Sequence, residues 1–153
     1  MHFRQNTEGY FVDGKGRILA KDSGKGYVIF PGGGINPGES AEQAILRETL
    51  EETGAVVEGI KKIGALQIKW DKDWAKTSKQ KERQGEFQGD EMHFFSGKIK
   101  GFSKGSNEED TQQGEKLMPI KDVILLIEKS RPFESGIAEY REFQLKYLKS
   151  LTA

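Results

Sequence analysis

The chain has 153 residues, a common size for one globular domain, and we expect a single domain over residues 1–153. It contains no cysteine, which excludes a disulfide framework, thiolate metal ligands and a cysteine nucleophile. Lysine plus arginine and aspartate plus glutamate number 24 each, so the overall charge gives no attraction to nucleic acid or to an anionic membrane surface.

No segment approaches the roughly 18 consecutive apolar residues that suggest a membrane-spanning helix. Residues 1–13 are polar and lack the apolar stretch of a secretory signal. We therefore expect a cytoplasmic protein, a monomer or a homodimer, that has neither a membrane nor a nucleic acid as its partner.

Two strands joined by a tight turn are predicted close to the N-terminus. Residues 9–12 and 17–20 are rich in apolar side chains, and the sequence Asp-Gly-Lys-Gly at 13–16 is typical of a hairpin turn. A further apolar run at 26–30 predicts another strand, and Pro31 with the three glycines after it must end that strand. We expect the strand to lead into a glycine loop.

The strongest helix prediction covers residues 41–53. Ser40 and Gln43 form a capping-box pattern at its start. Gly54 stands where a left-handed C-terminal cap is expected. The helix should begin and end at these signals.

Strand patterns return at residues 60–68 and 92–99. Residues 71–90 between them predict a long, charged loop. Two interpretations of this loop stay open, a lid or binding loop and a plain solvated insertion. Residues 101–115, rich in glycine, serine and glutamate, predict a second loop.

Two helices are predicted in the last part of the chain. A short helix is expected at 121–128, after Met118, Pro119 and Ile120. In the final segment, apolar side chains recur at helical spacing on one face, namely Ile137, Tyr140, Phe143, Tyr147, Leu148 and Leu151. This pattern indicates an amphipathic helix that closes over the core.

Three glutamates on the predicted 41–53 helix indicate the chemistry. Glu48, Glu51 and Glu52 stand at positions i, i+3 and i+4, so their carboxylates form one acidic edge. Like charges at this spacing repel each other unless a cation lies between them. Ligation by oxygen alone suits a hard ion, Mg²⁺ or Mn²⁺, and disfavours zinc. The sequence therefore predicts a magnesium site.

Both sides of this helix are expected to be at least partly packed. Ala41, Ala44 and Ile45 project in nearly the same direction as the acids, one or two turns earlier, while Leu46 and Leu50 lie opposite. A purely solvated run of charges is not usually built in this way. The pattern therefore favours a ligand site over a charged exterior.

The stretch from residue 33 to residue 55 resembles the Nudix box. That pattern is a glycine, five residues, a glutamate, seven residues, then Arg-Glu-x-x-Glu-Glu-x-Gly and an aliphatic residue. The matching positions are Gly33, Glu39, Arg47, Glu48, Glu51, Glu52, Gly54 and Ala55. Thr49 departs from the family preference for an aliphatic residue, and we expect it only to loosen local packing.

The resemblance to the Nudix hydrolase family, which includes MutT-like proteins, implies an α/β fold with a mixed β-sheet sandwiched between α-helices. It implies Glu48 and Glu52 as metal ligands, with Glu51 as a third or water-mediated ligand. A backbone carbonyl of Gly32 or Gly33 would complete the site. The implied cofactor is Mg²⁺, with Mn²⁺ as the other suitable ion.

The same resemblance implies hydrolysis of a diphosphate bond, in which water attacks phosphorus in line. Catalytic roles then fall to Glu52, Glu51 and Arg47. Arg47 is expected to orient the glutamates through charge-assisted hydrogen bonds. Glu39 and Gly54 take structural roles.

The identity of the general base stays open. Within the box, Glu52 is the candidate. A glutamate from elsewhere in the chain is the alternative, and the candidates are Glu91, Glu108, Glu109 and Glu115.

The substrate implied is a small nucleotide-like diphosphate. Trp70 and Trp74 are candidates to stack on a nucleobase, with Gly34 as a further substrate contact, whereas His93 is expected to be a core or sheet-face residue. We favour a nucleoside triphosphate pyrophosphatase. Hydrolysis of ADP-ribose, dinucleoside polyphosphates or RNA 5′ ends, and a catalytically silent nucleotide-sensing domain, remain alternatives.

Overall fold

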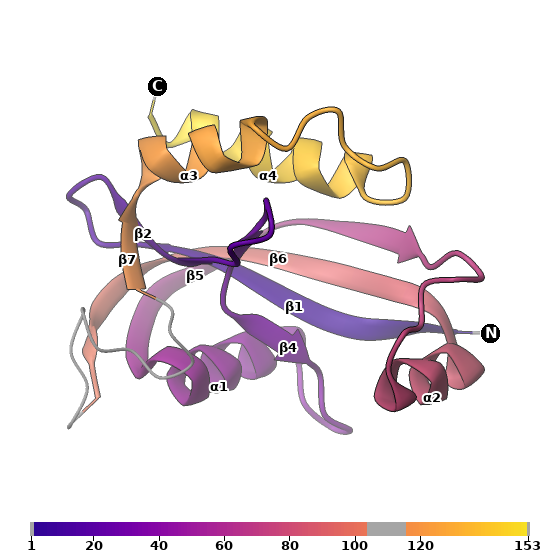
Figure 1. Cartoon of the computed structure of the whole chain (residues 1–153). Helices are drawn as coiled ribbons and strands as arrows, with labels where there is room; N and C mark the ends of the chain where they lie inside the picture. The colour runs from indigo at the N-terminus through magenta and orange to yellow at the C-terminus, as the bar shows by residue number, and fades with distance from the viewer. Residues whose placement is uncertain (1, 104–115, 153) are drawn as a thin grey trace.

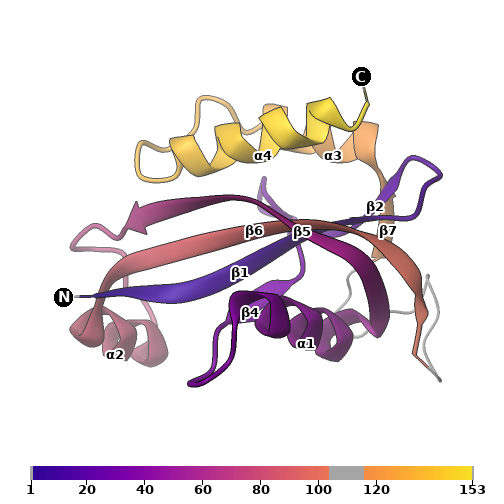
Figure 2. The same cartoon turned by 180° about the vertical axis from the view of Figure 1, so that it is seen from behind.

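The computed structural model describes residues 2–103 and 116–152. Its elements in chain order are β1 (His2–Val12), β2 (Arg17–Asp22), β3 (Val28–Ile29), β4 (Gly32–Gly34), α1 (Ala41–Thr53), β5 (Ala55–Lys69), α2 (Ser78–Glu86), β6 (Phe87–Phe102), β7 (Lys116–Pro119), α3 (Ile120–Glu128) and α4 (Ala138–Ser150). The sheet lies between two helical layers, with α3 and α4 over one face and α1 over the other (Figure 1). Seen from behind, α2 lies at the far end on the α1 side (Figure 2). The predicted α/β sandwich is confirmed.

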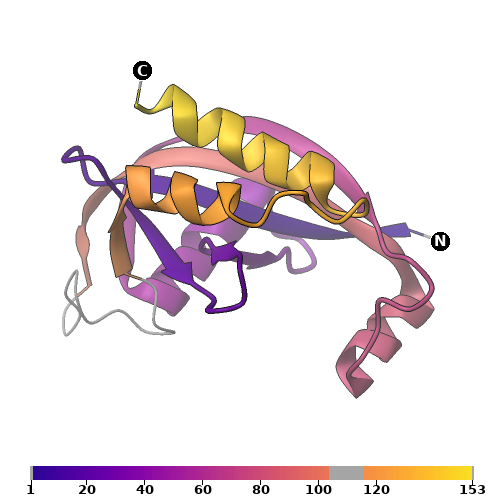
Figure 3. The same ribbon diagram turned by 45° about the horizontal axis from the view of Figure 1, so that its top comes forward.

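The sheet is mixed, as predicted. Its main strand order is β3-β2-β1-β6-β5, with β4 paired to β1 and β7 paired to β2. Strand β1 runs parallel to β6 and antiparallel to β2 and β4. The two long strands β5 and β6 form an antiparallel pair that curves beneath the C-terminal helix (Figure 3). Strand β1 is therefore the central strand, and residues on it reach both faces.

Alternation along the central strands builds a core on each face of the sheet. Tyr10 and Phe94 are buried with residues of α3 and α4. Phe11 and Phe95, one position further along each strand, are buried with Ile45 of α1. Each helical layer is thus fixed to the sheet by its own apolar cluster.

Helix α1 begins and ends where its sequence signals predict. The Ser40 side chain accepts a hydrogen bond from the Gln43 N–H, and the Gln43 side chain accepts one from the Ser40 N–H. Gly54 ends the helix with a φ of 77°, a left-handed conformation that favours glycine. The glutamate-bearing helix is therefore fixed at both ends by local interactions.

The predicted glycine loop is wrong, because Gly32–Gly34 forms strand β4. Gly33 is paired with Thr7 of β1, and Gly32 with Glu8. A Cβ atom at Gly32 would lie 1.9 Å from the Thr7 carbonyl oxygen, so a side chain there would force the two strands apart. The glycines allow β4 to pair closely with β1. A run of proline and glycines is more typical of a turn, so the sequence alone does not indicate this pairing.

The prediction of one long loop at 71–90 is also wrong. Residues 78–86 form α2, and β6 already begins at Phe87. Thr77 and Gln80 form a capping box at the start of α2. No residue of α2 is buried, so the helix has no apolar face from which periodicity could have identified it.

The C-terminal predictions are confirmed. Helix α3 starts one residue earlier than expected, and α4 packs with the predicted apolar face, in which Leu148 is fully buried, against the sheet. Most of the predicted loop at 101–115 lies outside the described residues, whereas residues 101 and 102 end β6. No described helix is both long and apolar enough to cross a membrane.

The expected packing on both sides of α1 is only half right. Ala44 and Ile45 are fully buried, but Leu46 and Leu50 are 41% and 45% exposed. The sheet covers one face of α1, and the described elements leave the opposite face to solvent (Figure 1). The acidic edge therefore lies beside a single packed face.

Thr49, the departure from the box pattern, is fully buried on that packed face. Its hydroxyl is buried without a hydrogen-bond partner. A buried hydroxyl with no partner destabilises the folded state, typically by about 1–3 kcal/mol. Looser packing was the only consequence expected at this position, but the unpartnered hydroxyl adds an energetic cost of its own.

Replacing Thr49 by valine is expected to stabilise the protein by about 1 kcal/mol, because the substitution removes the unpartnered hydroxyl and keeps the shape. Thermal unfolding should then shift upward by about 2–4 °C. Thr53→Val is the matched control, since the equally buried Thr53 hydroxyl donates to the Thr49 carbonyl and accepts from the Ala55 N–H. That variant should be destabilised, and a loss of stability in Thr49→Val would contradict the prediction.

Candidate functional site

The box residues gather where β4 meets α1. Thr7 of the central strand holds the glycine strand in place, because its hydroxyl donates a 2.9 Å hydrogen bond to the Gly33 carbonyl. The Gly33 N–H lies 3.3 Å from the same hydroxyl oxygen. The glycine backbone is therefore fixed in front of the helix that carries the acids.

Two of the three glutamates lie against this glycine backbone. A Cβ atom at Gly33 would be 2.5–2.8 Å from the carboxylate atoms of Glu48, so the missing side chain leaves the space that this carboxylate uses. The Gly32 N–H points to Glu52 Oε2 at 3.5 Å. Glu51 is turned outward, with 59% of its side chain exposed. The predicted acidic edge thus divides into an inner pair and one outer residue.

Arg47 is hydrogen-bonded to several residues of the box. Its guanidinium binds Glu39 through two hydrogen bonds, Nε to Oε2 at 2.7 Å and Nη2 to Oε1 at 2.9 Å. It also donates to the Gly34 carbonyl at 3.1 Å and to Glu48 at 3.0 Å, and it lies 3.4 Å from Glu51. One side chain therefore links both ends of the box.

The ion pair with Arg47 lowers the pKa of Glu39 from 4.5 to about 2, chiefly through the side-chain hydrogen bonds and then through the Asn36 N–H. A lowered folded-state pKa stabilises the fold above the unfolded-state pKa. That contribution is lost as the pH falls from about 4.5 towards 2. The same pair raises the pKa of Arg47, so its charge persists throughout.

Glu39→Gln is expected to remove this part of the acid dependence. Denaturant unfolding at a series of pH values from 6 to 2 measures the free energy of unfolding of both proteins. The wild type should lose stability more steeply than the variant below about pH 4.5, and the two curves should approach each other near pH 2. Parallel curves across the range would show that the Glu39 carboxylate has no such role.

The donors at the junction of β4 and α1 fit a hard divalent cation. Glu48 and Glu52 offer carboxylate oxygens beside the hollow that a Cβ at Gly33 would fill, and the Gly33 carbonyl lies in the same strand. Across the ranges 2–103 and 116–152, no three acidic or histidine side chains are gathered as ready metal ligands. Glu48 also accepts a hydrogen bond from Arg47.

A cavity of about 500 Å³ is lined by the glycine strand, by the neighbouring strands of the sheet and by the start of α4. Its lining includes Asn6, Glu8, Gly32, Gly33, Trp70, Trp74, Asp90, Met92, Ile137 and Tyr140. Gly32 and Gly33 therefore border the cavity and the inner glutamates at once. This volume lies in the range of small-molecule sites.

Glu8 is the buried acid of this cavity. Its carboxylate accepts hydrogen bonds from the Tyr10 hydroxyl at 2.5 Å, from the Tyr140 hydroxyl and from Gln144 Nε2 at 3.2 Å. Burial raises the pKa of Glu8, and the two tyrosines and Gln144 oppose that rise. A carboxylate has about four acceptor positions, so these three donors leave room for one from a ligand.

The predicted tryptophans both line the cavity, and they stack on each other. Their ring centroids lie 3.8 Å apart and the planes differ by 7°. Trp70 is anchored because its Nε1–H donates to Asp90 at 3.0 Å. The fixed indole of Trp70 is therefore a flat surface at the wall of the cavity.

The remaining predicted residues lie nearby in different roles. The Gly34 carbonyl is engaged by Arg47. His93 lies on the sheet face as expected, with Nε2 2.7 Å from Gln5 and Nδ1 2.9 Å from Lys62. Glu91 accepts from Gln67 at 2.9 Å on the same face. The other candidate bases, Glu108, Glu109 and Glu115, lie outside the described residues.

Sequence reasoning missed the polar residues of the cavity, chiefly Asn6, Glu8, Asp90 and Tyr140. One signal was available for Glu8. It stands two residues before Tyr10, so it shares the inner face of the same strand with a buried aromatic ring. A charged residue in line with core residues is a candidate for function.

The mixed sheet between helices and the capped helix whose glutamates lie against a glycine strand together define the Nudix class of fold and site. The family model described as the NUDIX domain matches residues 4–140. The chain therefore belongs to the NUDIX domain family.

Two curated relatives illustrate the range of the family. The chain is 45% identical over 51 residues to a Bacillus subtilis (strain 168) protein provisionally named 8-oxo-dGTP diphosphatase YtkD, covering 33% of this chain and 32% of that protein. It is 40% identical over 67 residues to an RNA pyrophosphohydrolase of Teredinibacter turnerae, covering 42% and 39%. The matches thus span less than half of either relative.

Solved structures share the fold over nearly the whole chain. A NUDIX hydrolase from Nitrosomonas europaea superimposes with a TM-score of 0.62 at 16% identity, covering 98% of this chain and 90% of that one. A MutT NUDIX hydrolase from Burkholderia pseudomallei gives 0.56 at 18% identity, covering 93% and 98%. At these identities the likeness describes the fold alone.

Proposed function

We propose that this protein is a single-domain, Mg²⁺- or Mn²⁺-dependent hydrolase that cuts a diphosphate bond in a nucleoside 5′-triphosphate. The observation that carries the proposal is the position of Gly32 and Gly33. They border the cavity on one side, while Glu48 and Glu52 lie against them. A nucleoside in the cavity can thus extend its phosphates past the glycine strand to the acids.

Glu48 and Glu52 would hold the cation, with the Gly33 carbonyl as a further oxygen donor and Glu51, which is turned outward, contributing through a bound water. When bound, the ion supplies positive charge for the diphosphate oxygens and activates the attacking water. The glycines matter for this role because their bare backbone admits both phosphates and carboxylates. Family membership and the hard oxygen donors support this assignment.

Residues of the box would also accept the proton and position the acids. Glu52 accepts the proton from the attacking water, while Glu91 remains the described candidate outside the box. Arg47 is a positioning residue, since its hydrogen bonds to Glu39, Glu48 and the Gly34 carbonyl fix where Glu48 stands relative to the glycine strand. The protein contributes mainly through arrangement and charge, as expected for phosphoryl transfer.

The cavity would take the nucleoside. Trp70 offers a fixed ring for stacking on a base, and its anchor on Asp90 keeps that ring in place. Glu8 offers a carboxylate that accepts from amino or imino groups on a base edge. The relative named 8-oxo-dGTP diphosphatase is consistent with a purine at this position.

A panel of nucleoside triphosphates, ADP-ribose and dinucleoside polyphosphates, each incubated with and without Mg²⁺, tests the proposal. Product analysis by chromatography should show release of pyrophosphate or phosphate from at least one triphosphate, and only with the metal. Calorimetry on the same panel provides the control. Tight binding without turnover would overturn the enzyme assignment and favour a sensing domain.

A further inference from the structure

Two hydrogen bonds in series link the buried acid Glu8 to Arg141 of α4. Gln144, which is fully buried, stands between them. Arg141 Nη1 donates to Gln144 Oε1 at 3.0 Å, and Gln144 Nε2 donates to Glu8 Oε2 at 3.2 Å. Arg141 and Gln144 are three residues apart on one helix, so their side chains are neighbours. Arg141 is therefore connected to Glu8 through the single amide of Gln144.

Arg141 determines the orientation of that amide. A guanidinium can only donate hydrogen bonds, so the end of the amide that faces it must be the carbonyl oxygen. The amino end then faces the carboxylate of Glu8. Without Arg141 the amide is free to rotate, and an oxygen turned towards Glu8 would repel the carboxylate. Burial raises the pKa of Glu8, whereas Gln144 and the charge of Arg141 both oppose this rise.

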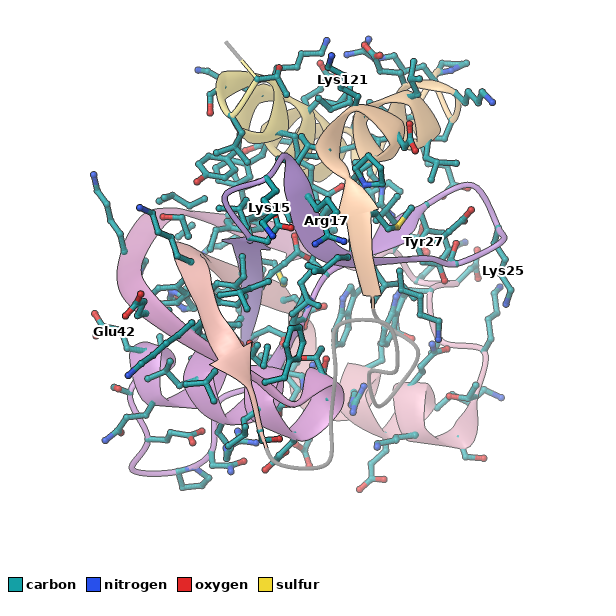
Figure 4. All side chains as sticks on the ribbon, turned by 90° about the vertical axis from the view of Figure 1, so that its left-hand side faces the viewer. Lys15, Arg17, Lys25, Tyr27, Glu42 and Lys121 are labelled. Atoms are coloured by element: carbon teal, nitrogen blue, oxygen red, sulfur yellow. The ribbon has the colours of Figure 1, made fainter. Side chains whose placement is uncertain are left out.

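Arg141 is itself held between aromatic rings. Its guanidinium carbon lies 5.0 Å from the centroid of the Tyr140 ring and 5.4 Å from that of the Tyr27 ring. Tyr27 belongs to the loop between β2 and β3 (Figure 4). Cation–π contacts at such distances favour one placement of the guanidinium. The position of Arg141 is thus fixed by contacts within the protein.

The two oxygens of Glu8 have different surroundings. Oε2 accepts from Tyr10 and Gln144, neither of which lines the cavity in the described part of the chain. Oε1 accepts from Tyr140, which lines the cavity together with Glu8. A carboxylate oxygen has two acceptor positions, so Oε1 retains one. Oε1 is therefore the oxygen that can accept a hydrogen bond from a ligand.

We propose that Arg141 is a positioning residue for recognition of the base. It fixes the amide of Gln144, the amide holds Oε2 of Glu8, and Oε1 is left in place to accept from an N–H group of the base. The role is remote, since Arg141 is not among the described residues that line the cavity. This inference rests on the proposed function, because it concerns the nucleoside of the same substrate.

GTP and ATP report this role because their bases differ at the edge that Glu8 would contact. Guanine carries neighbouring imino and amino N–H donors, whereas adenine has an acceptor nitrogen at the imino position, which a fixed acceptor disfavours. We expect the wild type with Mg²⁺ to have a lower KM for GTP than for ATP. Arg141→Ala should raise KM for GTP about tenfold, as expected for losing a hydrogen bond to a charged group. Its kcat and its KM for ATP should change little.

Arg131→Ala is the matched control. Arg131 also holds α4, through hydrogen bonds to Glu142, but it is exposed and lies outside the chain that leads to Glu8. Its removal should leave both KM values unchanged. Arg141→Lys keeps a donor and should retain part of the preference for GTP. Gln144→Met removes the amide, and adding Arg141→Ala to it should raise KM for GTP no further, because Arg141 acts through that amide.

Calorimetry with GMP and AMP, without metal, gives a readout independent of turnover. Weaker binding of GMP alone in Arg141→Ala supports the inference even if no triphosphate is hydrolysed, a result that would defeat only the proposed function. Equal effects on GMP and AMP, additive effects of Arg141→Ala and Gln144→Met, or a wild type that does not distinguish the two nucleotides would overturn it. Thermal unfolding shows whether each variant is folded, and Arg141→Lys replaces the alanine variant if that one is not.

Discussion

Glu52→Gln is expected to lower kcat by about 10²–10⁴-fold while the fold is retained. Glutamine keeps the size of the side chain but removes the negative charge that binds the cation and accepts a proton. The Glu52 carboxylate lies 3.5 Å from the Gly32 N–H, at the strand that borders the cavity, so a neutral group there weakens the hold on the cation that would screen the substrate phosphates. Steady-state kinetics with Mg²⁺ measures the loss.

Glu42→Gln is the matched control for this substitution. Glu42 lies in the first turn of the same helix and is exposed (Figure 4). It should leave kcat unchanged, and circular dichroism should show that both variants are folded. Wild-type turnover in Glu52→Gln would remove the role assigned to this carboxylate.

Gly33→Ala is expected to reduce kcat/KM by about 10²-fold or more, because a misplacement of about 1 Å at a reacting group can cost that much. The added Cβ would lie 2.5–2.8 Å from the carboxylate atoms of Glu48 and would displace them. Since the obstacle is the end of a flexible side chain, the fold should persist. Titration with Mn²⁺ should show weaker binding of the ion.

Two further variants separate this effect from general damage. Gly85→Ala places a Cβ where no atom lies within 4 Å, inside α2, and should keep full activity with slightly higher stability. Gly33→Ala combined with Glu48→Asp shortens the displaced side chain and should recover part of the Mn²⁺ affinity. Undiminished activity in Gly33→Ala alone would show that the contact with Glu48 is not needed.

The sequence predicts what local interactions determine. Helix α1 has a capping box at one end and a left-handed glycine at the other, so its bounds follow from the residues that flank it. The spacing of Glu48 and Glu52 within that helix then places both acids on one side. The relative positions of the box glutamates could be predicted because the geometry of the helix that carries them fixes those positions.

The cavity could not be predicted because it depends on contacts between distant segments. Glu8 meets Tyr140 and Gln144 only after α4 packs on the sheet. Strand β1 pairs in parallel with β6. Parallel strands are not joined by a short turn, so no turn sequence identifies them as partners. The glycine strand was likewise misjudged, since its role appears only beside Thr7.

The stacked indoles give the protein a built-in optical reporter. The chain has two tryptophans, and both stand at the wall of the first cavity, so all indole emission comes from that place. Rings 3.8 Å apart and nearly parallel also interact electronically, which should produce a paired band in the near-ultraviolet dichroism spectrum. Any molecule that separates the rings or slides against Trp70 should therefore change both signals, and occupancy can be followed in unlabelled protein.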